Sequence, residues 1–419
     1  METSLVCIDC GKAHEPSRVW QCECGGLLEA RTSGIDISTG ELDRRLGKRS
    51  FPFNSGVWIY KELVNPLIDD KMIVSKTEGN TTIYSHRKTS EFSGVAKLYL
   101  KHEGENPTGS FKDRGMTVGV SEAVRLGCRM VGCASTGNTS ASLAAYASTA
   151  GIRSVVFIPS GEIAYGKLSQ TMAYGAKVVQ VKGNFDDAMR LIQEICAKRE
   201  IYLLNSINPW RIEGQKAIAF ELLQQMHWNP PDWIALPAGN LGNTSAIGKA
   251  LRELKGLGLV EKMPRIAAIQ AEGADPFYRM WKGGDAGLRR IERPSTLASA
   301  IRIGNPVSWK KAIRAIKECS GVVERVSDQE IMNAKAVIDS SGIGCEPASA
   351  ASLAGVRKLR MGGVIKEDET VVCILTGNIL KDPDATINYH RGALSGVVAS
   401  YANAPVQADA DSESIMKIL

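Results

Sequence analysis

The sequence predicts an α/β protein built on doubly wound, mainly parallel sheets, and two patterns support this prediction. Short apolar, β-branched runs such as Met130 to Ala134 and Val371 to Leu375 alternate with segments of helical periodicity. Strands that are apolar along their whole length are covered on both faces, as in parallel sheets flanked by helices. A chain of 419 residues is also long enough to divide into separate cores, so we expect two or more domains.

The expected elements begin with a strand at 97–102 and a helix that starts at Ser110, because Ser110 and Asp113 have the spacing of a capping box. A strand at 130–134 precedes an alanine-rich helix from Thr139 to about Gly151. Further strands are expected at 154–158, 177–181, 201–204, 233–236, 266–270 and 371–375. We expect a small cysteine knuckle over 1–30, a large domain formed by 31–122 and 208–400, a smaller mobile domain over 123–207, and a frayed tail over 401–419.

Composition excludes several classes of protein. The 51 basic and 45 acidic residues give a formal net charge of +6, spread along the chain without a basic run of the kind that binds nucleic acid. No stretch reaches the roughly 18 apolar residues of a membrane span. The first residues lack the basic start and apolar core of a signal peptide. We therefore expect a cytoplasmic protein with no nucleic-acid or membrane partner and with ten reduced cysteines.

Four of the ten cysteines cluster near the N-terminus, at Cys7, Cys10, Cys22 and Cys24. Their spacing is C-x2-C-x11-C-x-C, in which the second pair is one residue short of the usual zinc-ribbon pair. Four thiolates form the tetrahedral set of a structural zinc site. A bound zinc ion is one interpretation, and four metal-free thiols on a small knuckle are the other.

In doubly wound sheets a ligand lies beyond the carboxyl ends of the strands, so chemistry is expected in the strand-to-helix turns. The first such turn, Glu103 to Gly115, reads EGENPTGSFKDRG. It places Lys112 in the first turn of a helix, where the helix dipole and partial burial lower the pKa of an amine. An amine of lowered pKa is a nucleophile toward carbonyl carbon, whereas the alternative is a solvated surface lysine.

Three further turns carry hydroxyls, amides and glycines. Residues 134–140, ASTGNTS, suit a carboxylate or phosphate at a helix N-terminus, or form no more than an N-cap. Residues 237–244, PAGNLGNT, contain two glycines, and their amides could surround a phosphate. Thr376 follows the last strand-like run and is expected to reach the same crevice.

Together the four turns offer a lysine amine, two anion sites and a neutral hydroxyl, which is the set that pyridoxal 5'-phosphate requires. The motifs GENPTGSFKDRG, STGNTSAS, GNLGN and LTGNILKDP, in this order, resemble those of the threonine synthases, fold-type II pyridoxal-phosphate enzymes of the tryptophan-synthase-β superfamily. The resemblance extends from the cysteines to about Asp384. Asn378, Ile379 and Ala238 depart from residues common in relatives, so we expect a ring pocket of somewhat different shape.

The resemblance implies a role for each turn. Lys112 would hold the cofactor covalently and then shuttle protons. The other implied cofactor contacts are Asn138 at the ring hydroxyl, Thr376 at the pyridine nitrogen, and Gly239, Asn240, Leu241, Gly242 and Asn243 at the phosphate. The implied substrate contacts are Ser135, Thr136 and Thr139 at the carboxylate, and Asn205, Ser206 and Arg211 at the substrate phosphate.

The reaction implied by the resemblance converts O-phospho-L-homoserine and water to L-threonine and phosphate by γ-elimination and β-addition. The resemblance also implies a homodimer. A serine or threonine dehydratase, or another relative that replaces a β-substituent, would share the cofactor; such dehydratases usually read GNHAQ where this chain has Asn138, Thr139 and Ser140. In a different class, a zinc-ribbon nucleic-acid-binding protein would use the cysteines and the net positive charge.

Overall fold

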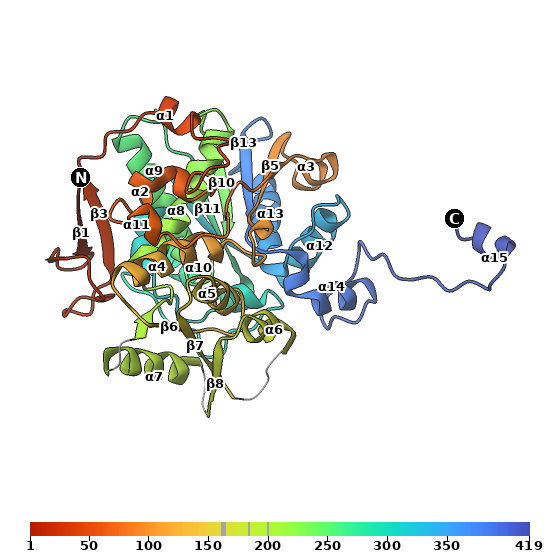
Figure 1. Cartoon of the computed structure of the whole chain (residues 1–419). Coiled ribbons are helices and arrows are strands. Elements are labelled where there is room, and N and C mark those ends of the chain that lie inside the picture. Colours follow the sequence, from red (N-terminus) through yellow and green to blue (C-terminus); the bar gives the residue numbers. More distant parts are fainter. Residues whose placement is uncertain (161–164, 183–184, 199–200) are drawn as a thin grey trace.

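A computed structural model describes residues 1–160, 165–182, 185–198 and 201–419, and its strands form three sheets (Figure 1). The largest sheet has the strand order β12-β11-β10-β13-β5-β4, and the second has the order β8-β7-β6-β9. Within the described strands of these two sheets, only β4 (Ile83–Tyr84) pairs in an antiparallel manner, with β5 (Lys97–His102). The predicted α/β class with doubly wound parallel sheets is therefore confirmed.

The other strands and the helices alternate along the chain. The large sheet also contains β10 (Trp233–Pro237), β11 (Arg265–Ala271), β12 (Val322–Val326) and β13 (Thr370–Leu375), and the small sheet contains β6 (Met130–Ala134), β7 (Arg153–Pro159), β8 (Lys177–Val181) and β9 (Ile201–Leu203). The helices are α1 (Thr39–Asp43), α2 (Lys61–Val64), α3 (Arg87–Ser93), α4 (Lys112–Arg125), α5 (Asn138–Thr149), α6 (Tyr165–Ala173), α7 (Phe185–Lys198), α8 (Pro209–Gln225), α9 (Gly242–Gly256), α10 (Pro276–Gly283), α11 (Trp309–Glu318), α12 (Asp328–Asp339), α13 (Pro347–Met361), α14 (Pro383–His390) and α15 (Ser412–Met416).

The central strands are apolar along their length because each faces two cores. Ile234 and Leu236 of β10 belong to the core that contains residues of α8 and α9. Trp233 and Ala235, which point to the opposite face of the same strand, belong to the core that contains residues of α13. Helices thus cover both faces of the large sheet, which is why its strands could be recognised from uninterrupted apolar runs.

Within the large sheet the sequence analysis missed two strands, β12 and β4, and both lie at its edges. Glu324 and Arg325 interrupt the apolar pattern of β12, and only two of its five residues are buried. An edge strand is covered less completely, so it does not need the continuous apolar run that identified the others.

The helix after β5 begins at Lys112, two residues later than predicted, and the predicted capping box is wrong. The carboxylate of Asp113 accepts hydrogen bonds from the backbone N–H and the hydroxyl of Thr108, both at 2.6 Å. Ser110 instead forms an isolated antiparallel bridge with Gly377, beyond the end of β13. The turn therefore pairs with the chain beyond the end of β13, and Ser110 makes this contact instead of capping the helix.

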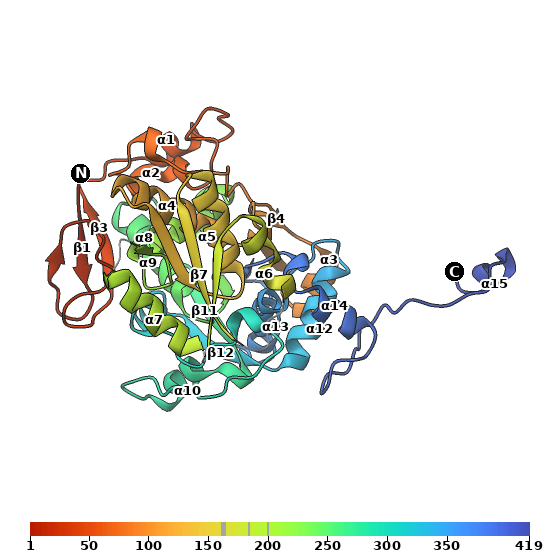
Figure 2. The ribbon, with the colours of Figure 1, turned by 60° about the horizontal axis from the view of Figure 1, so that its bottom comes forward.

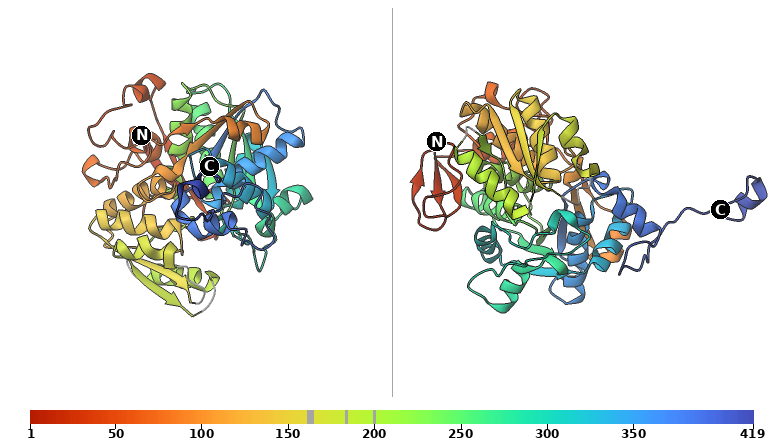
Figure 3. Two further views of the ribbon diagram at one scale, coloured as in Figure 1. Left: turned by 90° about the vertical axis from the view of Figure 1, so that its right-hand side faces the viewer. Right: turned by 90° about the horizontal axis from the view of Figure 1, so that it is seen from below.

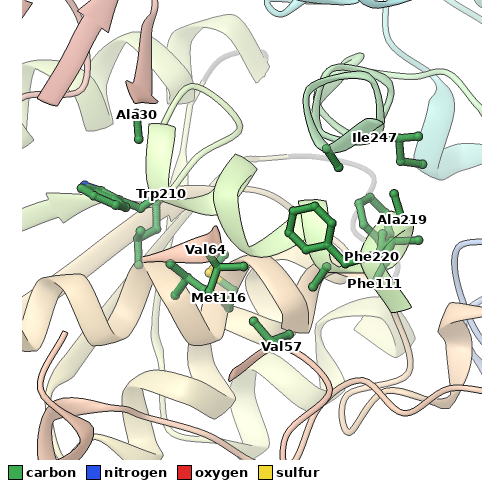
Figure 4. Close-up of a cluster of buried hydrophobic side chains, with 14 of the residues drawn as sticks. Ala30, Val57, Val64, Phe111, Met116, Trp210, Ala219, Phe220 and Ile247 are labelled. Atoms are coloured by element: carbon green, nitrogen blue, oxygen red, sulfur yellow. The ribbon is translucent and has the colours of Figure 1, made fainter. Parts of the chain in front are cut away.

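Two helices connect the sheets. Helix α4 leads from β5 in the large sheet to β6 in the small one, and α8 leads back from β9 to β10, and these two helices pack against each other. Figure 4 shows the buried side chains around them, including Met116 of α4 and Trp210 and Phe220 of α8. Each fully buried side chain of this size contributes about 2 to 3 kcal/mol by removal of apolar surface from water. The turns at either end of α4 and α8 are thereby held in fixed positions.

The two ends of the chain lie apart from these sheets. Strands β1 (Glu2–Cys7), β2 (Ala13–His14) and β3 (Leu28–Ser33) form an antiparallel sheet at one side of the molecule (Figure 2). Beyond α14 the chain runs away from the body and ends at α15 (Figure 3). Among the helices that the structure describes, none combines the length and the apolar character needed to cross a membrane.

Candidate active site

The turns that follow β5, β6 and β13 meet at the carboxyl ends of the two sheets. The backbone N–H of Phe111, in the turn after β5, donates to the carbonyl of Thr376 at 3.0 Å. Asn138, at the start of α5, donates from Nδ2 to Oε2 of Glu346 at 3.0 Å. Side chains that the sequence placed on separate turns therefore lie in one region, between the large and the small sheet.

Lys112 is the first residue of α4, and its side chain is partly buried. Burial and the nearby guanidinium of Arg211 lower the pKa of Lys112 to about 7, while the carboxylate of Glu346 opposes this shift. Nζ lies 4.0 Å from the centroid of the Phe111 ring. At neutral pH about half of the Lys112 amines are therefore unprotonated and can act as nucleophiles.

Arg211, near the start of α8, is a buried cation without a carboxylate partner within the described part of the chain. Its side chain is 1% exposed, and Nη1 donates to the carbonyl of Leu204 at 3.1 Å, while Nε has no partner. Burial lowers the pKa of Arg211 to about 10, which still leaves the guanidinium charged at neutral pH. An uncompensated buried charge is costly, so this position favours an anionic ligand.

The turn after β6 is held in place by Asn205. Nδ2 of Asn205 donates to the carbonyl of Ala134, and the N–H of Ala134 donates to Oδ1 of Asn205, both at 3.0 Å. Both polar atoms of this side chain are therefore engaged with the backbone next to Ser135. The hydroxyl of Ser135 accepts from the N–H of Gly137 at 3.2 Å, while Thr136 is exposed. Thr139 and Ser206 are both partly exposed.

The turn after β10 leads into the N-terminus of α9, which lacks a side-chain cap. Leu241 adopts a left-handed backbone conformation there, with φ of 64°. Both polar atoms of the Asn243 amide and the hydroxyl of Thr244 are buried without a hydrogen-bond partner. Buried polar groups are normally satisfied, so these atoms, together with the N–H groups of the first helical turn, indicate a site for an anion.

The turn after β13 contains a network that the sequence analysis missed. The hydroxyl of Thr376 donates to Oε1 of Glu346 at 3.3 Å, and it lies 3.0 Å from Oγ of Ser349. Glu346 directly precedes α13 and is 5% exposed. Burial raises its pKa, although hydrogen bonds and the cations Lys381 and Lys112 act in the opposite direction. Glu346 precedes a helix instead of following a strand, and the one local signal is an acidic residue before a proline at a helix start.

Comparisons with known proteins agree with this geometry. Residues 74–377 match the family described as pyridoxal-phosphate dependent enzyme. The chain is 49% identical over 383 residues to threonine synthase of Methanocaldococcus jannaschii, covering 91% of this chain and 93% of that one. It is likewise 49% identical over 387 residues to threonine synthase of Methanosarcina acetivorans, covering 92% and 93%. The chain belongs to the threonine synthase family of pyridoxal-phosphate-dependent enzymes. The similarity to a solved structure of maize serine racemase, with a TM-score of 0.65 at 18% identity and covering 85% of this chain and 98% of that one, concerns the fold alone.

Membership of the threonine synthase family makes pyridoxal phosphate the cofactor, and the residues present suit it. The unsatisfied polar atoms of Asn243 and Thr244 lie at a helix N-terminus, where a phosphate is stabilised by N–H groups and the helix dipole. Lys112 supplies an amine of lowered pKa for the aldehyde carbon. A Cβ atom on Gly115 of α4 would lie 3.0 Å from Nε2 of Gln215, and one on Gly242 of α9 would lie 3.9 Å from Oε1 of the same side chain, so the N-terminal turns of the two helices are neighbours.

The four N-terminal cysteines lie together on the small antiparallel sheet and the turns beside it. Their Sγ atoms are all within 4.8 Å of one another, with Cys7 and Cys24 at 3.5 Å and Cys10 and Cys22 at 3.7 Å. A tetrahedral zinc site with bonds of about 2.3 Å separates its sulfur atoms by about 3.8 Å. The cluster therefore has the size of a structural zinc site. Nε2 of His14 lies 3.4 Å from Sγ of Cys22.

Proposed function

We propose that this chain converts O-phospho-L-homoserine and water to L-threonine and inorganic phosphate. The observation that carries the proposal is the buried guanidinium of Arg211, which has no carboxylate partner in the described ranges and acts electrostatically on Lys112. A planar guanidinium suits a phosphate dianion. A dehydratase that acts on serine or threonine binds no substrate phosphate, so it gains nothing from an uncompensated cation at this place.

Pyridoxal phosphate, when bound, withdraws electrons from the substrate and so acidifies the hydrogens on Cα and Cβ. In the proposed reaction Lys112 would hold the cofactor until the substrate amine replaces it. Its free Nζ would then take the proton from Cα, give that proton up, and take one from Cβ. Arg211 binds the phosphate that leaves from Cγ. The hydroxyl of water adds at Cβ, and protons are returned to Cγ and to Cα, so that one water enters for each phosphate released.

The remaining residues bind and orient. We assign Ser135, Thr136 and Thr139 to the substrate carboxylate, because their hydroxyls and N–H groups lie at or just before the N-terminus of α5. Ser206 is assigned to the substrate phosphate beside Arg211. Because both amide atoms of Asn205 are engaged with Ala134, its proposed contribution is to hold the carboxylate-binding turn in place.

The cofactor itself is assigned a second group of residues. Asn138 faces its ring hydroxyl and Thr376 its ring nitrogen. Its phosphate would be held at the N-terminus of α9, which lacks a side-chain cap, by Gly239, Asn240, Leu241, Gly242 and Asn243.

We further propose a zinc ion on Cys7, Cys10, Cys22 and Cys24, supported by the sulfur separations. We also propose two domains, because the strands form separate six-stranded and four-stranded sheets. The large domain comprises residues 31–122 and 208–400, and the smaller, mobile domain comprises residues 123–207. A homodimer and a cytoplasmic location are also proposed, in keeping with a biosynthetic enzyme that acts on a small molecule.

The proposed reaction is tested by incubating the purified protein, loaded with pyridoxal phosphate, with O-phospho-L-homoserine, L-serine and L-threonine in separate assays. We expect stoichiometric phosphate and threonine from the first substrate and little ammonia from the others. The Lys112→Ala variant should release no phosphate, while Lys97→Ala, an exposed lysine at the start of β5, should behave as wild type. Ammonia from serine or threonine without phosphate release from phosphohomoserine would show a dehydratase instead.

A further inference from the structure

Glu346 lies where the turns of the two sheets meet, and the proposed reaction assigns no role to it. Its carboxylate accepts one hydrogen bond from Nδ2 of Asn138, on the small-sheet side, and another from Oγ1 of Thr376, on the large-sheet side. These are the two residues assigned to the polar groups of the cofactor ring. One buried carboxylate thus connects both ring contacts and also the two sheets.

The hydrogen bonds to Glu346 fix the orientation of both partners. An ionised carboxylate can only accept, so the amide nitrogen of Asn138 must face it, which leaves the second N–H and Oδ1 of Asn138 for a ligand. Oγ1 of Thr376 lies within hydrogen-bond distance of Oε1 of Glu346, at 3.3 Å. Oγ of Ser349 lies 3.0 Å from this hydroxyl and accepts from the N–H of Gly377 at 2.9 Å. Glu346 and Ser349 therefore hold the Thr376 hydroxyl in place from two sides.

The backbone around Glu346 is shaped to bring the carboxylate into the site. Glu346 occupies the N-cap position of α13, but its side chain makes no capping hydrogen bond to that helix and is available to the site. Its own N–H donates to the carbonyl of Gly377 at 3.0 Å. A Cβ atom on Gly377 would lie 2.5 Å from the carboxyl carbon of Glu346, so only glycine allows this close approach.

We propose that Glu346 is a positioning residue for the cofactor, which aims the Asn138 amide at the ring hydroxyl and, together with Ser349, holds the Thr376 hydroxyl at the ring nitrogen. The proposal rests on the assignment of Asn138 and Thr376 made above. Replacement by glutamine keeps the shape but leaves one acceptor oxygen in place of two, so at least one of the two hydrogen bonds is lost. Charge-assisted bonds of this kind correspond to about tenfold to hundredfold in an equilibrium constant.

The test compares wild type with Glu346→Gln, and with Glu367→Gln as a matched control on an exposed glutamate that pairs with Arg360. The first readout is the dissociation constant of pyridoxal phosphate from the protein, measured by titrating cofactor into the stripped enzyme. The second is the visible absorption of the bound cofactor as a function of pH. The charged groups that act on Glu346 there are Lys112 and Lys381, with Cys345 next to it in sequence. The third is the separation of kcat from KM.

For Glu346→Gln we expect cofactor binding weakened about tenfold or more and a displaced pH midpoint of the visible band. We also expect kcat lowered about tenfold, with KM changed less than about threefold. A double variant with Thr376→Val should show less than the sum of the two single effects on cofactor binding. Glu367→Gln should match wild type in every measurement.

The proposal would be overturned if the cofactor dissociation constant, kcat and KM of Glu346→Gln were all within twofold of wild type and its visible spectrum were unchanged. A lowered melting temperature with unchanged spectrum and cofactor binding would also overturn it, because it shows a purely structural role. If Glu346→Gln does not fold, Glu346→Asp, which keeps the charge but shortens the reach, must show the weakened cofactor binding. The spectrum and the cofactor affinity need no substrate, so failure of the wild type to release phosphate would refute the proposed reaction without deciding this test.

Discussion

Glu29 provides a quantitative test of how the N-terminal sheet is joined to the rest of the molecule. It lies on β3, its side chain is 5% exposed, and its Oε1 accepts from Arg314 of α11 at 2.6 Å. Arg252 of α9 lies 3.5 Å away. Lys311 donates to the backbone carbonyl of the neighbouring residue Leu28 at 2.6 Å. The sheet that bears the cysteines is therefore attached through buried charges as well as through apolar contacts.

The contribution of Glu29 to the free energy of unfolding follows from its pKa. Burial alone would raise this pKa, but the four cations Lys249, Arg314, Lys311 and Arg252 outweigh burial and lower the pKa from 4.5 to about 2. A carboxyl group whose folded pKa is depressed adds stability above its unfolded pKa, and that stability is lost as the pH falls toward the folded value. The contribution of Glu29 is about 3 kcal/mol at pH 7 and about 1 kcal/mol at pH 3.

Hydrogen exchange of the backbone amides in β3 measures this contribution locally. Glu29→Gln should lower the protection of these amides about a hundredfold at pH 7 and about tenfold at pH 3. Glu91→Gln removes an exposed ion pair with Arg87 and should leave the amides of β3 within about twofold of wild type. Equal losses at both pH values, or no loss at pH 7, would refute the electrostatic attachment.

Three further predictions concern the site and the metal. The rate at which pyridoxal phosphate attaches to stripped enzyme should rise with pH and be half-maximal near pH 7, because the Lys112 pKa is lowered to about 7; a midpoint near 10 would contradict the burial argument. Arg211→Ala should raise KM for O-phospho-L-homoserine about tenfold to hundredfold, with a smaller change in kcat. Steady-state kinetics at saturating cofactor measure both constants, and an unchanged KM would contradict the prediction. Metal analysis should find one zinc per chain in wild type and none in Cys22→Ser, which should keep the visible absorption of the bound cofactor; zinc retained in that variant would exclude Cys22 as a ligand.

The parts of the fold that could be predicted from the sequence are those for which the physical requirement is local. Strands β5, β6 and β8 match their predicted bounds. In β6, which is buried over 131–134, the reason is that an apolar run covered on both faces leaves a direct pattern in the sequence. The start of α4 could not be predicted in this way. It depends on the bridge between Ser110 and Gly377, which are more than 260 positions apart, and this contact overrides the local capping signal.

The same distinction applies to the site. Motifs after strands identified Lys112, Asn138 and Thr376, and the structure brings these turns together. Glu346 was missed because its importance arises only from what it contacts, on two other turns. Asn205 shows the reverse case. The resemblance implies that it contacts the substrate phosphate, whereas in the structure its side chain forms hydrogen bonds with the backbone of Ala134.

The distribution of charge in the site indicates how ligands affect the stability of the protein. Arg211 has no carboxylate partner in the described residues, and Asn243 and Thr244 keep buried polar atoms without partners. Folding therefore leaves these groups unsatisfied, at a cost that a phosphate can remove. A ligand that binds only the folded state stabilises it in proportion to the logarithm of its concentration over its dissociation constant. Pyridoxal phosphate should therefore raise the melting temperature of Lys112→Ala as well, because the phosphate contacts do not require the covalent bond; no increase at millimolar cofactor would place the anion site elsewhere.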